Sequence, residues 1–170
     1  MPFLVKTFVA GGCRLNSDQE PIGAAVCIKA GPNNVKLVNY EGALPANHRP
    51  QPTADRADLA AVILGLQAGW NRYVSSKWNP QMDVKIHTAS QYAVNVMTVY
   101  KREYARNYFM DPETSAVVEN RDLMRRAYEL LDDLEEVGRV EFVLLRRGEG
   151  RINRLAEGGV KVVLDELEEE

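Results

Sequence analysis

The stretch Phe8-Val9-Ala10-Gly11-Gly12-Cys13 decides how the first part of this chain folds. Before it, Lys6 to Val9 alternate polar and apolar residues, which is the pattern of a half-buried strand. Two glycines follow, and they predict a sharp turn because glycine adopts backbone conformations that other residues avoid. We therefore expect a strand over residues 3–10 that ends at Ala10, with this residue at the edge of a sheet.

Further strands are predicted along the chain from apolar or alternating runs bounded by turn residues. The first three strands follow one another through short connections, as in an antiparallel meander, and each of the last two follows a helical pattern. The sequence thus predicts an α/β fold, with a three-stranded meander extended by two strands through helices, and helices on both faces of the mixed sheet. The four further strands are expected at residues 22–30, 35–42, 82–88 and 139–145.

Four helices are expected from apolar residues spaced three and four apart. Thr53, directly after Pro52, is a suitable N-cap for the first of them. Gly158 and Gly159 weaken the last helix because glycine disfavours helical structure. Residues 165–170 are expected to form a solvated acidic tail. The later helices are predicted over residues 90–100, 120–137 and 152–167, with a polar and aromatic segment at 101–117 between them.

Length and composition limit the possible classes of protein. A chain of 170 residues fits one domain, here residues 1–170, and a net charge of −3 argues against a protein that binds nucleic acid over its whole surface. Cys13 and Cys27 are too few for a disulfide framework or a zinc site, and no apolar run reaches membrane-spanning length. We therefore expect an intracellular protein, nuclear or cytoplasmic, that does not insert into a membrane.

Five stretches, in order, resemble the motifs of type 1 ribonucleases H, most closely the fungal cellular form. This resemblance extends over residues 3–165 and implies a ribonuclease H-like fold. Members of that family cleave the RNA strand of an RNA–DNA hybrid. The stretches are Val9 to Ser17, Thr53 to Leu59, Ile86 to Tyr92, Asn120 to Leu123, and Ile152 to Ala156.

The resemblance also identifies where catalytic carboxylates would stand. The family holds two divalent metals with four carboxylates, and the matching positions here are Ala10, Asp58, Ala89 and Asn153. A methyl group cannot bind a cation, and one remaining negative charge does not balance two divalent ions. Asp55 and Glu157 lie one helical turn away from two of these positions, and we expect them to stay outside the site. The resemblance therefore implies an inactive relative of an RNA–DNA hybrid endoribonuclease, with no metal cofactor.

A protein-binding or scaffolding role is the first functional hypothesis, since the acidic charge and the lost site favour a protein partner over a hybrid. An exposed tryptophan and a group of tyrosines are candidate anchors for this partner, because aromatic residues often dominate interfaces. They are Trp78, Tyr100, Tyr104 and Tyr108.

Weak binding of RNA or of an RNA–DNA hybrid without cleavage is the alternative hypothesis, through clusters of basic residues and positions that match the family's substrate contacts. An engineered inactive enzyme is a third, although Leu15, Ala54 and Asp55 depart from the family in ways that a designer would have no reason to introduce. The candidate nucleic-acid contacts are Asn16, Thr53, Arg56, Lys101, Arg102, Arg106, Arg146, Arg147, Arg151 and Arg154.

Overall fold

The computed structural model describes residues 3–34, 36–47, 49–77, 81–111, 113–169. Five strands form one mixed sheet in the order β3-β2-β1-β4-β5, with β1, β2 and β3 antiparallel and with β4 and β5 added parallel to β1. This confirms the predicted meander and its two added strands. The strands are β1 (Phe3–Leu15), β2 (Pro21–Ala30), β3 (Leu37–Leu44), β4 (Met82–Thr88) and β5 (Val140–Leu144).

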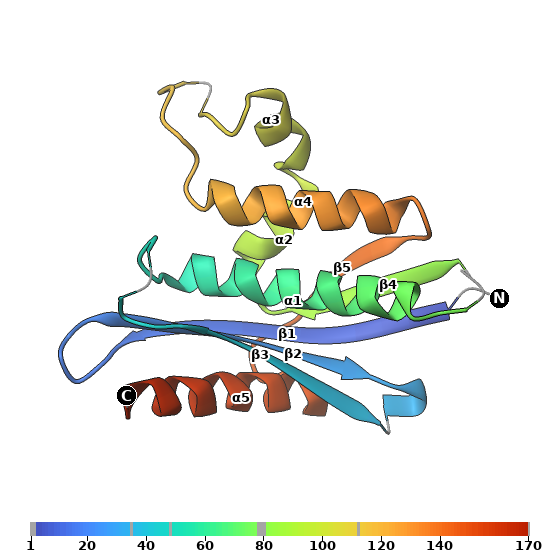
Figure 1. Cartoon of the computed structure of the whole chain (residues 1–170), viewed down its shortest axis with the longest axis horizontal. Helices are drawn as coiled ribbons and strands as arrows, with labels where there is room; N and C mark the ends of the chain where they lie inside the picture. The colour runs from blue at the N-terminus through green and yellow to red at the C-terminus, as the bar shows by residue number, and fades with distance from the viewer. Residues whose placement is uncertain (1–2, 35, 48, 78–80, 112, 170) are drawn as a thin grey trace.

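Helices cover both faces of the sheet, as predicted (Figure 1). α1 (Ala54–Val74), α2 (Gln91–Thr98) and α4 (Arg121–Glu135) lie on one face, where they share a large apolar core with β1, β4 and β5. α5 (Arg151–Glu168) lies on the opposite face and packs on β1 and β2. The short α3 (Lys101–Arg106) stands further out, beyond α2 and α4, and a short 3-10 turn, η1 (Pro32–Asn34), connects β2 to β3.

β1 does not end at Ala10, so the predicted sharp turn is wrong. The strand continues through both glycines to Leu15, and Gly11 and Gly12 pair with β2 in the regular antiparallel register. A Cβ atom on Gly11 would lie 2.4 Å from the backbone carbon of Ala57 in α1, and one on Gly12 would lie 2.7 Å from Val160 in α5. The two glycines therefore let the helices approach β1 closely from opposite faces.

α5 begins and ends within one residue of the predicted helix at 152–167, and it continues through Gly158 and Gly159 to Glu168. Most of the residues expected to form an acidic tail are thus helical. Arg14 of β1 donates hydrogen bonds to Asp165 at 2.7 Å and to Glu168 at 2.6 Å, which ties the end of this helix to the sheet. Packing on β1 and β2 supplies the stability that the glycines remove, since tertiary contacts override helix propensity.

The sequence patterns place the cap and the most buried strand correctly. The Thr53 hydroxyl accepts a hydrogen bond from the N–H of Arg56 at 3.1 Å, which confirms it as the N-cap of α1. β2 is buried along nearly its whole length, because it lies between β1 and β3 and has helices on both faces. In the part of the chain that the structure describes, none of the helices combines the length and the apolar character needed to cross a membrane.

Candidate functional site

A cavity of about 380 Å³ opens where β1 and β4 pass the N-terminal ends of α1 and α2. Its lining includes Ala10 from β1, Asp58 from α1 and Ala89 directly after β4. The fold thus brings together three of the four positions that the resemblance identified. Asn153, the fourth, is fully buried in the first turn of α5 and is not part of the lining.

The ionised form of the Asp58 carboxylate is disfavoured by its surroundings. Its burial raises its pKa to about 6, because a charged group loses its hydration there. The Ser90 hydroxyl, the charge of Arg147 and the N–H of Gly11 favour the ionised form, whereas the nearby Asp55 disfavours it. A bound metal ion would stabilise the ionised form of such a carboxylate strongly. The neighbours of Asp58 stabilise that form less, because its pKa remains raised.

Glu157 lies in the cavity lining although it is one helical turn from Asn153, and its expected inability to replace a metal ligand stays a prediction. The sequence indicated that Glu157 lies near Asn153, because residues four apart share one side of a helix. The Glu157 carboxylate accepts the N–H of Gly148 at 3.1 Å and the side-chain amide of Asn153 at 3.2 Å. The same Asn153 amide donates to the carbonyl of Arg146 at 3.4 Å. Asn153 and Glu157 together therefore hold the loop between β5 and α5.

The side chains that line the cavity do not provide a suitable set of ligands for a pair of divalent metal ions. Two such ions about 4 Å apart require several shared oxygen ligands, most of them charged. Ala10 and Ala89 present methyl groups, and the Glu157 carboxylate already accepts hydrogen bonds from Gly148 in the loop and from Asn153 in α5. Among the residues that the structure describes, no three His, Cys, Asp or Glu side chains are grouped so that they would hold a metal ion.

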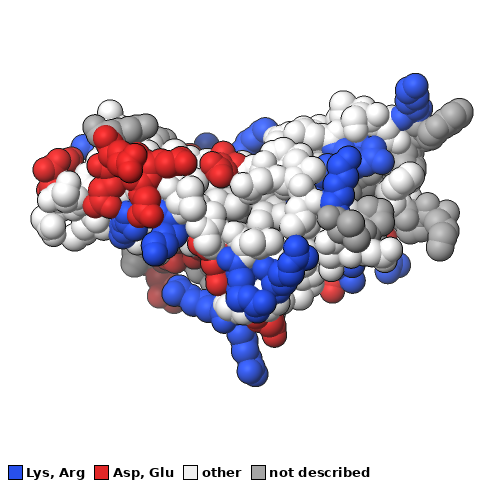
Figure 2. Space-filling view, turned by 90° about the horizontal axis from the view of Figure 1, so that it is seen from below, with Lys and Arg blue, Asp and Glu red and all other residues white. Residues whose placement is uncertain are grey.

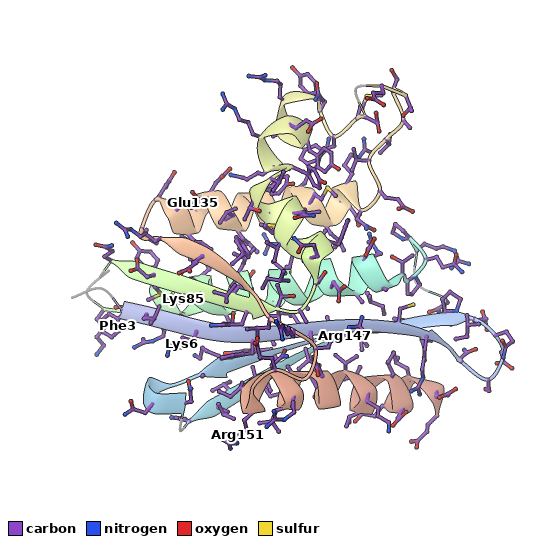
Figure 3. All side chains as sticks on the ribbon, turned by 180° about the vertical axis from the view of Figure 1, so that it is seen from behind. Phe3, Lys6, Lys85, Glu135, Arg147 and Arg151 are labelled. Atoms are coloured by element: carbon purple, nitrogen blue, oxygen red, sulfur yellow. The ribbon has the colours of Figure 1, made fainter. Side chains whose placement is uncertain are left out.

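The loop between β5 and α5 carries basic residues to the rim of the cavity. Arg147 lines the cavity and lies where this loop passes β1 (Figure 3). The loop is well anchored, since the Arg154 guanidinium donates to the carbonyl of Gly148 at 3.2 Å and the N–H of Arg146 donates to Glu149 at 3.3 Å. Arg146, Arg151 and Arg154 are exposed. Only Arg147 of this cluster contributes to the cavity itself.

The position of Arg56 differs from what its assignment as a nucleic-acid contact requires. It was expected to contact nucleic acid, but it is only 3% exposed. Its guanidinium donates to both carboxylate oxygens of Asp122 in α4, at 2.9 and 2.5 Å, and to the Asn120 side chain at 3.4 Å. The Asn120 amide in turn donates to the Tyr92 hydroxyl at 3.0 Å. We call Arg56, Asp122 and Asn120 the Arg56 clamp, because they join the start of α1 to the start of α4.

Two other polar candidates have local structural roles. The Asn16 side chain accepts the N–H groups of Asp18 and Glu20, both at 2.9 Å, and so closes the hairpin between β1 and β2. Thr53 caps α1 but remains exposed beside the cavity residue Ala54.

The basic and aromatic segment around α3 divides into packed and exposed side chains. Lys101 forms an ion pair with Asp132 of α4, and the Tyr100 and Tyr104 rings lie 5.5 Å apart. Arg102 and Arg106 are exposed, as is Tyr108, whose exposed fraction is 80%. Trp78 lies outside the described residues, so its expected exposure stays a prediction.

Comparisons with known proteins identify the fold. No family model matches the chain, and no curated protein matches its sequence. Among solved structures, LC9-RNase H1, a type 1 RNase H with the type 2 active-site motif, is 22% identical with a TM-score of 0.66, over 95% of this chain and 72% of that one. The PFV RNase H domain is 12% identical with a TM-score of 0.61, over 98% and 93% of the two chains.

A third similar structure is a foamy viral protease-reverse transcriptase in complex with an RNA/DNA hybrid. It is 14% identical with a TM-score of 0.70, and the match extends over 95% of this chain and 20% of the viral one. Together these similarities show that the chain has the ribonuclease H-like fold, as the sequence motifs implied. The cavity at Ala10, Asp58 and Ala89 lies beside the middle of β1 and the end of β4, two neighbouring strands of that sheet.

Proposed function

We propose that this chain is a ribonuclease H-like domain that has lost two-metal hydrolysis and acts as a protein-binding module. The lining of the cavity beside the middle of β1 and the end of β4 carries this proposal. Ala10 and Ala89 stand there where hydrolysis needs oxygen ligands, and Asp58 is the single carboxylate left at the four corresponding positions.

The fourth position supports the same conclusion. Asn153 donates its side-chain amide to Arg146 and Glu157, so it has a structural task that an aspartate cannot perform. A carboxylate at residue 153 would face the Glu157 carboxylate and lose both hydrogen bonds. The chain therefore uses this position to hold the loop after β5 in place of a metal ion.

The segment between α3 and α4 is the proposed surface for a partner protein. It leaves the body of the molecule as a small excursion in which Met110 and Val117 form a β-bridge. Tyr108 and Phe109 both have left-handed backbones, with φ of 54° and 60°, which non-glycine residues rarely adopt. Phe109 packs inward on Tyr128 at 5.9 Å between ring centroids, while Tyr108 projects into solvent.

This arrangement resembles a binding anchor, because the inward ring fixes the backbone from which the outward ring projects. Tyr108, Val117 and Met110 have exposed fractions of 80%, 54% and 39%, so they form an apolar surface around an aromatic side chain. Such rings contribute much of the free energy of protein association when a partner buries them. Backbone strain at an exposed aromatic residue is also typical of a functional position.

Affinity capture with a matched control tests the proposed partner surface. We expect Tyr108→Ala to lose at least ten-fold in affinity for the partner, whereas Val74→Ala, which removes an apolar side chain that is 62% exposed at the far end of α1, binds as the unchanged protein does. The affinity of the identified partner is measured by calorimetry with each variant. Equal binding by both variants would place the interface elsewhere.

Nucleic acid is the second candidate ligand, and the position of Arg147 favours it. This guanidinium lines the cavity on a loop that is already ordered, so little conformational entropy would be lost when it meets a phosphate. One structure with the same fold contains an RNA/DNA hybrid. Against this, Asp58 and Glu157 line the same cavity, and Arg56 is occupied by Asp122.

Salt dependence separates the two candidates. If the arginines bind phosphate, affinity for single-stranded RNA or a hybrid should fall steeply as salt increases, and charge reversal of Arg146 and Arg147 should abolish it. If a protein is the ligand, its binding should tolerate moderate salt. Gel-shift titration at near-physiological salt decides between them, and micromolar binding of nucleic acid that disappears in the double reversal would replace the protein-binding proposal.

A further inference from the structure

The outward face of α5 has an unusual composition for a solvent-facing helix surface. Leu155 and Val162, seven residues apart, have exposed fractions of 46% and 52%. Gly158 lies between them on the same face, and a Cβ atom at this position would have nothing within 4 Å. The centre of the outward face therefore combines two exposed apolar side chains with open space at a glycine.

Charged residues divide this face into two halves. Arg151 and Arg154 lie on its N-terminal half, and Asp165, Glu166 and Glu169 lie near its C-terminal end, after the single basic residue Lys161, all of them exposed. Viewed from below, acidic side chains gather where α5 ends and basic ones nearer the middle of the molecule, where the helix begins (Figure 2). Arg151 points away from the sheet at the start of α5 (Figure 3). The face is thus basic at one end, apolar in the middle and acidic at the other end.

We propose that a second copy of this chain packs on the outward face of α5, with the two helices antiparallel. A helix whose charge changes sign along its length is complementary to itself only when the second copy runs in the opposite direction. A two-fold axis near Gly158 then places Arg151 of each copy opposite Glu166 of the other, and Leu155 opposite Val162. The missing side chain at Gly158 lets the two helices approach closely at their crossing.

This inference does not depend on the proposed function, because it concerns a surface separate from both the cavity and the excursion at Tyr108. One helix face is smaller than the about 1,200 Å² of total area that stable interfaces usually bury. We therefore expect a dimer in the micromolar range that weakens as salt increases. In this dimer Arg151 faces the second copy, and Arg146 and Arg147 remain free to contact other ligands.

Paired charge reversals test the antiparallel arrangement directly. Arg151→Glu places a second carboxylate opposite Glu166, and Glu166→Arg places two guanidinium groups opposite each other, so each variant alone should dimerise at least ten-fold more weakly than the unchanged protein. Mixed in equal amounts, the two variants should form a heterodimer of unchanged affinity, because both opposing pairs are again of opposite sign. Sedimentation equilibrium over a concentration series measures these dissociation constants.

A glycine substitution separates folding from association. Gly158→Gln adds a helix-favouring residue in open space, so it should preserve or raise the melting temperature while it blocks the close approach of the two helices. Arg102→Glu, a reversal at an exposed residue of α3, is the matched control and should leave dimerisation unchanged. A protein that stays monomeric up to about 1 mM, or two reversal variants that fail to associate when mixed, would overturn the proposal.

Discussion

Two charged side chains near the start of α1 have opposite surroundings. Arg56 is almost completely buried, yet both oxygens of Asp122 accept its hydrogen bonds. Asp58, two residues later, lines a cavity in which the opposing positions carry the methyl groups of Ala10 and Ala89. Both residues belong to the same stretch that resembles the nuclease family. In this stretch the Arg56 guanidinium has a charge partner that joins two helices, whereas the Asp58 carboxylate shares its cavity with two methyl groups.

The two carboxylates involved also titrate in opposite directions. The hydrogen bonds from Arg56 lower the pKa of Asp122, because they stabilise its ionised form. Burial raises the pKa of Asp58 to about 6. The first carboxylate thus stabilises the fold when it is charged, and the second stabilises it when it is neutral. This difference distinguishes a structural ion pair from a buried carboxylate whose neighbours offset its burial only in part, and it can be tested group by group.

Breaking the Arg56 clamp should have the largest effect on stability. Asp122→Ala leaves the Arg56 guanidinium buried without its charge partner, and we expect a loss of about 2–3 kcal/mol in the free energy of unfolding, somewhat less than for a fully buried pair because the Asp122 side chain is 54% exposed. Asp55→Ala, which removes an exposed carboxylate from the same turn of α1, should change it by less than about 0.5 kcal/mol. Urea unfolding of both variants is the measurement, and equal losses would show that the clamp contributes nothing specific.

Restoring the missing carboxylates should have the next largest effect. The triple variant Ala10→Asp/Ala89→Asp/Asn153→Asp gathers like charges around Asp58 and removes the amide that holds Arg146 and Glu157. Without metal ions, we expect it to lose about 1–3 kcal/mol. Thermal unfolding in the presence of a chelator measures the change. An unchanged or higher melting temperature would contradict this account of the cavity.

A smaller effect is expected when Asp58 alone loses its charge. Since its pKa is higher in the folded state than the ordinary value of 3.8, the folded state binds the proton more tightly, and stability from this group rises as the pH falls from above 6 towards 4. Asp58→Asn should therefore raise stability at pH 7 by about 1–2 kcal/mol and remove its own part of the rise at acidic pH. Asp122 should behave in the opposite way, with its contribution lost as the pH falls through its lowered pKa. Denaturant unfolding between about pH 2 and 8 compares the two, because the contribution of Asp122 is lost only below its ordinary value of 3.8. An Asp58→Asn variant with the same pH profile as the unchanged protein would contradict the pKa argument.

Local patterns in the sequence were enough to predict the fold. Alternating residues and capping residues report on neighbours nearby in the chain, so the five strands and the N-cap at Thr53 were predicted, although β1 continues past Ala10 to Leu15. Gly11 and Gly12 were misinterpreted as a turn because their actual partners, Ala57 and Val160, lie far away in the sequence. The sequence alone does not distinguish a glycine needed for a turn from a glycine needed for close contact with a helix, because the second role depends on tertiary structure.

The candidate site was predictable only in part, for the same reason. The resemblance brought Ala10, Asp58 and Ala89 together correctly, since these positions follow from the fold. The role of Arg56 depends on Asp122, 66 residues further along the chain, and that of Glu157 on the loop at Gly148. Both side chains look available in the sequence, and only the tertiary contacts reveal that they are already used.

Hydrolysis of an RNA–DNA hybrid tests the central claim most directly. The purified protein is incubated with a labelled hybrid and Mg²⁺ or Mn²⁺, next to its Asp58→Ala variant. Because Ala10, Ala89 and Asn153 cannot supply the charged ligands that two metal ions require, we expect no turnover by either protein above the level without enzyme. Metal-dependent cleavage by the unchanged protein that disappears in Asp58→Ala would contradict the account.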